Sequence, residues 1–193
     1  MSKWLKWYML LIFVASSVGC SAVPSGVHDV LRLRVEIPID ATSTTIKDGS
    51  AFAISDHIVI TAFHVMEAYG SVYLNGYEVK VIAVYPFGED GMAFKVESLP
   101  PYTPRMRYTD NYGRGDTLIA SGYPDGLGYY SESGVCTATN VCTALFRGGM
   151  SGGPVSKNGV AVGLVSATLP SLGVSRFEPL PIDMLKGLIS ESN

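Results

Sequence analysis

Short apolar stretches separated by polar turns run through most of the chain. Residues 31–37 alternate apolar and charged side chains, which is typical of a strand with one buried face. Apolar runs on both sides of Asn75-Gly76 predict a hairpin, because Asn-Gly favours the tight turn that joins two strands. Further strands are predicted at 50–54, 58–60 and 92–96. The first half of the chain therefore predicts about six short strands.

A proline-rich segment at 100–104 interrupts the pattern, as a linker would. A second series of apolar runs then begins, at 116–121, 127–130, 133–144, 159–167 and 174–177. The tail has helical spacing, with a proline at its start where helices tolerate one. We expect an all-β fold of two six-stranded antiparallel β-barrels and a C-terminal helix. Barrel one would span about 31–99, barrel two about 113–180, and the helix about 181–190.

The first residues differ from the rest of the chain. Lys3 and Lys6 precede an apolar run that ends at Gly19 and is shorter than the roughly 20 residues that span a membrane. A charged start, a short apolar run and small residues are typical of an export signal. We therefore expect a signal peptide at 1–19, a tether at 20–30 and an exported protein.

The signal ends at Gly19-Cys20, which resembles the lipobox of bacterial lipoproteins. That resemblance implies lipidation of Cys20 and an anchor in a bacterial membrane, on its periplasmic or cell-surface side. Ser17 departs from the aliphatic residue usual three positions before the cysteine. Plain cleavage without lipid is the alternative.

Composition narrows the class of protein. The chain has 193 residues, 47% of them apolar and 16% charged, with a net charge of −3. The apolar content is enough for a sizeable core in one domain or two small sub-domains. The negative net charge gives no sign of the basic face that a nucleic-acid-binding protein needs. The sequence contains no metal-ligand cluster and no phosphate-binding loop. We expect a monomer without cofactors.

Three cysteines are an odd number for an exported protein. If Cys20 carries lipid, Cys136 and Cys142 remain and frame a short loop. An oxidising compartment would allow a disulfide between them across a hairpin. Two free thiols are the alternative.

The stretch from Gly148 to Pro154 places Ser151 among four glycines. Glycines permit a sharp turn that exposes one hydroxyl and aims backbone N–H groups into the same space. Such a turn can supply a nucleophile and an oxyanion hole. A base is also required, and of the three histidines His28 lies in the predicted tether and His57 in a predicted turn. His64 follows an apolar strand, where a side chain can be both oriented and accessible.

Several segments resemble chymotrypsin-like serine proteases, in particular the bacterial high-temperature-requirement type. The family's histidine segment is similar to residues 49–55 and 59–65, and its aspartate strand to residues 90–96. Its G-x-S-G-G-P-V motif is similar to residues 149–155. The strand that lines its cleft is similar to residues 163–166, and the end of its domain to residues 177–185. Their order matches the family's His, Asp, Ser. The resemblance implies Ser151 as nucleophile, His64 as general base, Asp90 as its orienting carboxylate, and the amides of Gly149 and Ser151 as an oxyanion hole.

Departures from the family leave some assignments open. Glu89 is the rival of Asp90, because Gly91 and Met92 differ from the family pattern. Met150 replaces the aspartate that pairs with a freed N-terminus in the trypsin branch, so we expect no such activation. The resemblance also implies that Leu145 stands where the trypsin branch has the aspartate of its substrate pocket, so we expect this pocket to be apolar.

The resemblance also implies that Ser166 lies in the strand that binds the substrate backbone. The predicted function is an exported serine endopeptidase acting on protein or peptide substrates. A protease-like lipoprotein that has lost activity and acts as a surface binding protein is the alternative.

Overall fold

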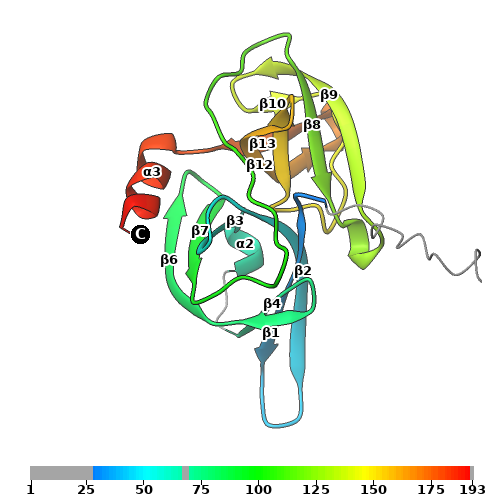
Figure 1. Cartoon of the computed structure of the whole chain (residues 1–193). Coiled ribbons are helices and arrows are strands. Elements are labelled where there is room, and N and C mark those ends of the chain that lie inside the picture. Colours follow the sequence, from blue (N-terminus) through cyan, green and yellow to red (C-terminus); the bar gives the residue numbers. More distant parts are fainter. Residues whose placement is uncertain (1–27, 67–69, 192–193) are drawn as a thin grey trace, which may run out of the picture.

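The computed structural model describes residues 28–66 and 70–191. The predicted signal peptide, Cys20 and the tether up to residue 27 lie outside the described residues. Two β-structures follow one another along the chain (Figure 1). Among the described residues, no helix is long and apolar enough to cross a membrane.

The first β-structure is a seven-stranded antiparallel sheet in the order β5-β4-β1-β2-β3-β7-β6. Its strands are β1 (Leu31–Pro38), β2 (Thr44–Ala53), β3 (Ile58–Ala62), β4 (Ser71–Leu74), β5 (Tyr77–Val79), β6 (Val81–Phe87) and β7 (Gly91–Val96). The predicted alternation in β1 is confirmed, since Leu31, Leu33 and Val35 are buried while the residues between them are partly exposed.

This sheet is open in its hydrogen bonding, so the structure does not show the first of the two predicted six-stranded barrels as a closed one. Its two edge strands, β5 and β6, follow one another with only Lys80 between them. A single residue is too short a connection for the chain to fold back and pair with itself, since even a tight hairpin needs two. The sheet therefore curls (Figure 1) without closing its hydrogen bonds.

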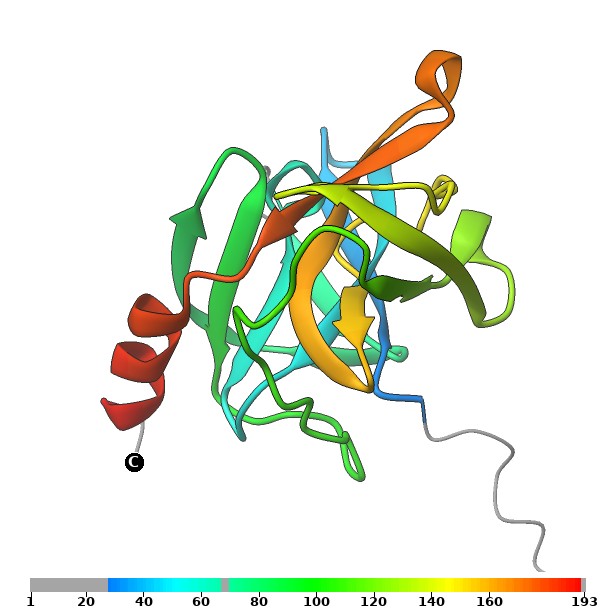
Figure 2. The same cartoon turned by 90° about the horizontal axis from the view of Figure 1, so that it is seen from above.

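The second β-structure is a closed six-stranded barrel in the order β10-β13-β12-β11-β8-β9, which confirms the predicted strand number. Its strands are β8 (Thr117–Gly122), β9 (Tyr130–Ala138), β10 (Val141–Cys142), β11 (Pro154–Lys157), β12 (Val160–Leu169) and β13 (Val174–Pro179). Short helical turns are α2 (Phe63–Met66), η1 (Pro124–Gly126) and η2 (Pro170–Leu172). The η2 turn closes the long β12–β13 hairpin that projects from the barrel (Figure 2).

Each β-structure has its own hydrophobic core, and the C-terminal helix belongs to the first. Helix α3 (Ile182–Ser190) buries Leu185 in the first core and lies beside β6 in both views (Figures 1 and 2). The second core includes Met150, which is fully buried. An apolar side chain at this position needs no cationic partner.

Cys136 and Cys142 are free thiols in the structure, so the predicted disulfide is absent from it. They occupy opposite positions on β9 and β10, and both are buried in the second core. The Cys136 thiol contacts the carbonyl oxygen of Ala138 at 3.1 Å.

The last residues of the predicted tether pack on the second barrel. The ring of His28 stacks on Tyr129, with ring centroids 3.6 Å apart. Val30 is buried, and its carbonyl oxygen accepts a hydrogen bond from the Tyr123 hydroxyl at 3.3 Å. Residues 28 and 30 therefore pack on the folded domain, although composition had assigned them to the tether.

Candidate active site

His64 and Asp90 are joined by several hydrogen bonds. His64 lies in α2, immediately after β3, and Asp90 ends the turn between β6 and β7. Nδ1 of His64 lies 2.9 Å from each carboxylate oxygen of Asp90. The His64 amide also donates to Oδ1 at 3.1 Å, and the Phe63 amide donates to the Asp90 carbonyl oxygen at 2.7 Å. Backbone and side chain together fix the imidazole against the carboxylate.

The second barrel supplies a further donor to Asp90. The hydroxyl of Ser166, on β12, donates to Oδ2 of Asp90 at 2.8 Å. Burial acts to raise the pKa of Asp90, but the hydrogen bonds from His64 and Ser166 outweigh it, and the pKa lies below its ordinary value. The carboxylate therefore stays ionised at neutral pH and can stabilise an imidazolium.

Glu89, the rival carboxylate, lies next to Asp90 but makes a different contact. Its Oε2 pairs with Nη1 of Arg176 at 2.8 Å, and its side chain is 75% exposed. Among the described residues, the carboxylate that the structure brings to His64 is that of Asp90.

Ser151 lies in a turn that packs directly on the first sheet. Its carbonyl oxygen accepts a hydrogen bond from the Ser50 amide at 2.8 Å. The next residue, Gly152, has φ +83° and approaches Thr61 and Ser50 so closely that a Cβ would collide with both. Because Thr61 lies three residues before His64, this contact places Ser151 near the start of α2.

The structure records no hydrogen bond between the Ser151 hydroxyl and the His64 imidazole, both of which it describes. The imidazole side chain is 48% exposed, so its other nitrogen is accessible. Nucleophile–base hydrogen bonds are often long in free enzymes and tighten in the complex with substrate. A free enzyme with this arrangement is therefore compatible with the predicted pair.

The amides of Gly149 and Ser151 donate no recorded hydrogen bond within the described residues. The carbonyls around them are tied down: the Gly148 oxygen accepts from the Asp125 amide at 2.9 Å, and the Gly149 oxygen from the Ser50 hydroxyl at 2.9 Å. Since the carbonyl and N–H of one peptide point in opposite directions, the first bond turns the Gly149 N–H away from Asp125. Two unpaired amides in one glycine turn can stabilise an oxyanion.

Sequence reasoning missed the residues that hold this turn. Ser50 bridges the two β-structures, because its hydroxyl also accepts from the Tyr123 amide at 2.9 Å. Asp125 lies in η1 with φ 49°, which is unusual for a non-glycine residue. The sequence held one signal for these residues, the similarity of residues 49–55 to the protease family. That similarity does not indicate which groups Ser50 contacts.

The two predicted substrate-binding residues lie in different settings. Leu145 is 44% exposed in the loop that leads to Ser151, while its neighbour Phe146 is buried. Ser166 occupies an irregularity between β12 and β13, where the pairing shifts from Val165 to Ala167. Its hydroxyl faces Asp90, a contact that was not predicted.

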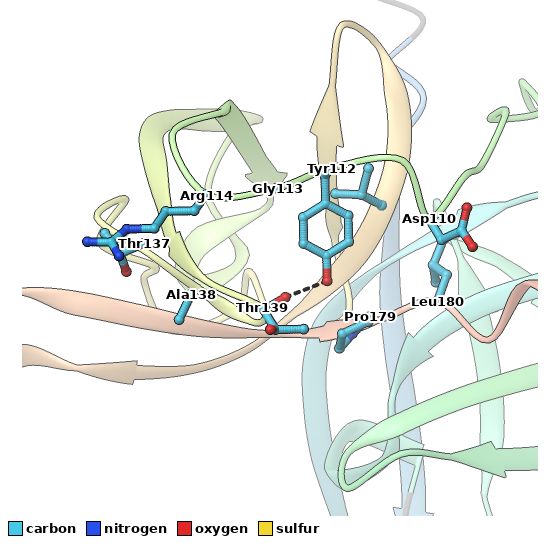
Figure 3. A pocket seen from close by; sticks show the side chains of 10 residues that line it. Asp110, Tyr112, Gly113, Arg114, Thr137, Ala138, Thr139, Pro179 and Leu180 are labelled. Atoms are coloured by element: carbon cyan, nitrogen blue, oxygen red, sulfur yellow. Dashed lines mark hydrogen bonds between the residues drawn. The ribbon is translucent and has the colours of Figure 1, made fainter.

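No group of metal-ligating side chains occurs among the described residues. A pocket of about 630 Å³ lies on the second barrel, away from the site, and its lining includes Tyr112, Arg114, Thr139 and Leu180. Figure 3 shows the Tyr112 hydroxyl pointing across this pocket to the carbonyl oxygen of Thr139. None of the predicted site residues lines this pocket.

Comparison with solved structures identifies several proteases with a similar fold. The active form of the Rv3671c protease from Mycobacterium tuberculosis superposes with a TM-score of 0.66 and 21% identity, over 83% of this chain and 79% of the other. Its inactive form gives 0.61 and 19%, over 84% and 88%. A serine endoprotease from Yersinia pestis gives 0.64 and 18%, over 84% of this chain and 62% of that protein.

No protein-family model and no curated protein matches the chain. At identities of 18–21% the structural likeness shows the fold. The chain thus has a chymotrypsin-like protease fold, made here of a closed six-stranded barrel, an open sheet and a short C-terminal helix.

Proposed function

We propose that the protein is a serine endopeptidase with Ser151, His64 and Asp90 as its catalytic triad. The observation that carries this proposal is the pair of 2.9 Å contacts from His64 Nδ1 to Asp90, close to a glycine turn with two unpaired amides. The shared fold with known proteases adds support.

Each chemical step of peptide hydrolysis is assigned to particular residues. Ser151 Oγ attacks the carbonyl carbon of the scissile bond while its proton passes to Nε2 of His64. Asp90 holds the Nδ1 proton and stabilises the imidazolium. The amides of Gly149 and Ser151 stabilise the oxyanion, and each such donor is worth roughly 3–4 kcal/mol. Nε2 then protonates the leaving amine, and water releases the acyl group by the same steps, which regenerates Ser151.

We propose an apolar or small residue before the scissile bond, based on Leu145. Matched peptides with Arg, Phe or Ala at that position test this preference. The expected order of kcat/KM places Arg last, and a clear preference for Arg would contradict it.

Export and anchoring are also proposed, from the sequence alone. A bacterial lipoprotein would carry its lipid on Cys20, so that Cys20→Ser moves the protein to the soluble fraction. Continued membrane association of that variant would count against lipidation, and retention in the cytoplasm would count against export.

Labelling with a fluorophosphonate probe tests the function. We expect labelling of the wild type and none of Ser151→Ala. Ser171→Ala is the matched control, since it removes an exposed serine of η2 and should be labelled normally. Folded wild type without Ser151-dependent labelling would support the alternative, an inactive protease-like binding protein.

A further inference from the structure

Three consecutive residues of the β6–β7 turn are each contacted by the second barrel. Gly88, with φ +58°, lies so close to the Glu178 carboxylate that a Cβ would collide with it. Glu89 pairs with Arg176 at 2.8 Å. Asp90 accepts a hydrogen bond from Ser166 at 2.8 Å. The loop that carries the proposed triad acid is therefore held from across the domain junction.

Arg176 and Glu178 belong to the same face of β13. They are two residues apart on a strand, so both side chains point away from the second core that contains Phe177. Glu178 is only 7% exposed, and its Oε2 has no hydrogen-bond partner among the described residues. The Arg176 side chain is 32% exposed, with a buried Nε that is likewise unpaired there. Such partial burial on a strand limits how far the guanidinium can move.

We propose that Arg176, through its ion pair with Glu89, is a positioning residue that fixes the turn and thereby sets Asp90 against His64. This inference rests on the proposed function and deepens it. An exposed ion pair adds little to global stability. The ion pair instead affects the geometry of Asp90, the residue that follows Glu89. Catalysis is far more sensitive to that geometry than global stability is to the ion pair.

The charges around Asp90 come from several elements. Arg176 of β13 interacts electrostatically with Glu89, Glu178 and Asp90, and Lys47 of β2 donates a 2.9 Å hydrogen bond to the His64 carbonyl oxygen. The hydrogen bond that Arg176 donates to Glu89 raises the pKa of Arg176 above its ordinary value, with Glu178 and Asp90 adding to the effect. Arg176 is therefore a permanent cation behind the triad acid.

Kinetics of Arg176→Gln, Glu89→Gln and the swapped pair R176E/E89R test the proposal. Each single change should lower kcat by roughly tenfold with little change in KM, because remote misplacement weakens transition-state stabilisation. The swapped pair should recover most of the loss. The acid limb of kcat/KM should move up by a few tenths of a pH unit in Arg176→Gln and down in Glu89→Gln, since the two changes remove opposite charges. Lys157→Gln is the control, as it breaks a 2.7 Å pair with Asp116 elsewhere on the second barrel.

Arg176→Lys keeps the test valid if the glutamine variant does not fold, and should retain most of kcat. NMR of the Nδ1 proton between His64 and Asp90 adds a readout that needs no catalysis. We expect this resonance in the wild type and its broadening in Arg176→Gln. Unchanged kcat, pH profile and resonance would overturn the proposal, as would equal losses in the swapped pair. If the wild type shows the resonance but has no protease activity, and the resonance broadens in Arg176→Gln, the proposed function is refuted and the positioning role is kept.

Discussion

The hydroxyl of Ser166 lies 2.8 Å from Oδ2 of Asp90, and this hydrogen bond joins the two β-structures at the proposed active site. Ser166 belongs to β12 of the closed barrel, and Asp90 to the β6–β7 turn of the open sheet. The side chain that orients His64 is therefore itself oriented by the opposite half of the molecule. Any shift between the halves would reach the imidazole directly.

Ser166→Ala should weaken catalysis without abolishing it. A hydrogen bond to a charged group contributes about 1.5–3 kcal/mol, and part of that loss will appear in the transition state. We expect kcat/KM to fall by roughly tenfold, with Asp90 still bound to His64. Steady-state kinetics check this, and a variant with wild-type kcat/KM would show that the bond has no catalytic role.

Ser50→Ala should disturb the oxyanion turn. Its hydroxyl donates to the Gly149 carbonyl and accepts from the Tyr123 amide, both at 2.9 Å. Loss of both bonds frees the Gly149–Met150 peptide, which lies between the two proposed oxyanion donors, so kcat should fall by about tenfold or more while KM changes little. Ser156→Ala, on β11, is the control, because the 3.3 Å bond from its hydroxyl to the Ile119 carbonyl oxygen links β11 to β8 and involves no residue of the glycine turn. Equal kinetics in the two variants would contradict this role for Ser50.

Acid should remove the contribution of Asp90 to stability. Its folded-state pKa lies below the ordinary value of 3.8, so its contribution is present above that value and is lost as the pH falls through the folded pKa. Urea unfolding of wild type and Asp90→Asn between pH 7 and pH 3 measures this effect. The difference in free energy of unfolding should shrink at the acid end. A constant difference over that range would contradict it.

Alkali should destabilise the fold through its buried thiols. Burial raises the pKa of Cys142 from 9.0 to about 11 and also raises that of Cys136. A raised folded-state pKa means that the contribution is complete below the unfolded pKa and declines as the pH rises towards the folded one. The free energy of unfolding should therefore decline between about pH 9 and pH 11, and less steeply in Cys142→Ala.

A thiol reagent distinguishes this state from a disulfide. In a Cys20→Ser background, Cys136 and Cys142 should react slowly in the native protein and rapidly after unfolding without a reductant. Unfolded protein that shows no reactive thiol would establish the disulfide that the structure lacks.

The sequence predicted those features that depend on local patterns. Strand alternation located β1, the Asn75-Gly76 turn joined β4 to β5, and the glycines around Ser151 indicated a sharp turn. It also offered His64 and Asp90, which the structure brings together. Residues that act across the junction gave no such signal. Ser50 and Arg176 have their roles only because the two β-structures meet, and no local pattern encodes that contact.

The open first sheet escaped prediction for a related reason. Strand number follows from apolar runs, but closure depends on whether the two edge strands can pair. With Lys80 alone between β5 and β6, they cannot. The choice between Glu89 and Asp90 likewise depended on which neighbour faces the second barrel's arginine and which faces His64.

The second-order rate constant for fluorophosphonate modification of Ser151, with the adduct located by mass spectrometry, tests the triad most directly. Wild type, Asp90→Asn and Glu89→Gln are compared under the same conditions. We predict that the adduct forms on Ser151, that Asp90→Asn slows it by about 10³-fold or more, and that Glu89→Gln slows it by no more than about tenfold. No adduct on Ser151, or a larger loss in Glu89→Gln than in Asp90→Asn, would contradict the account.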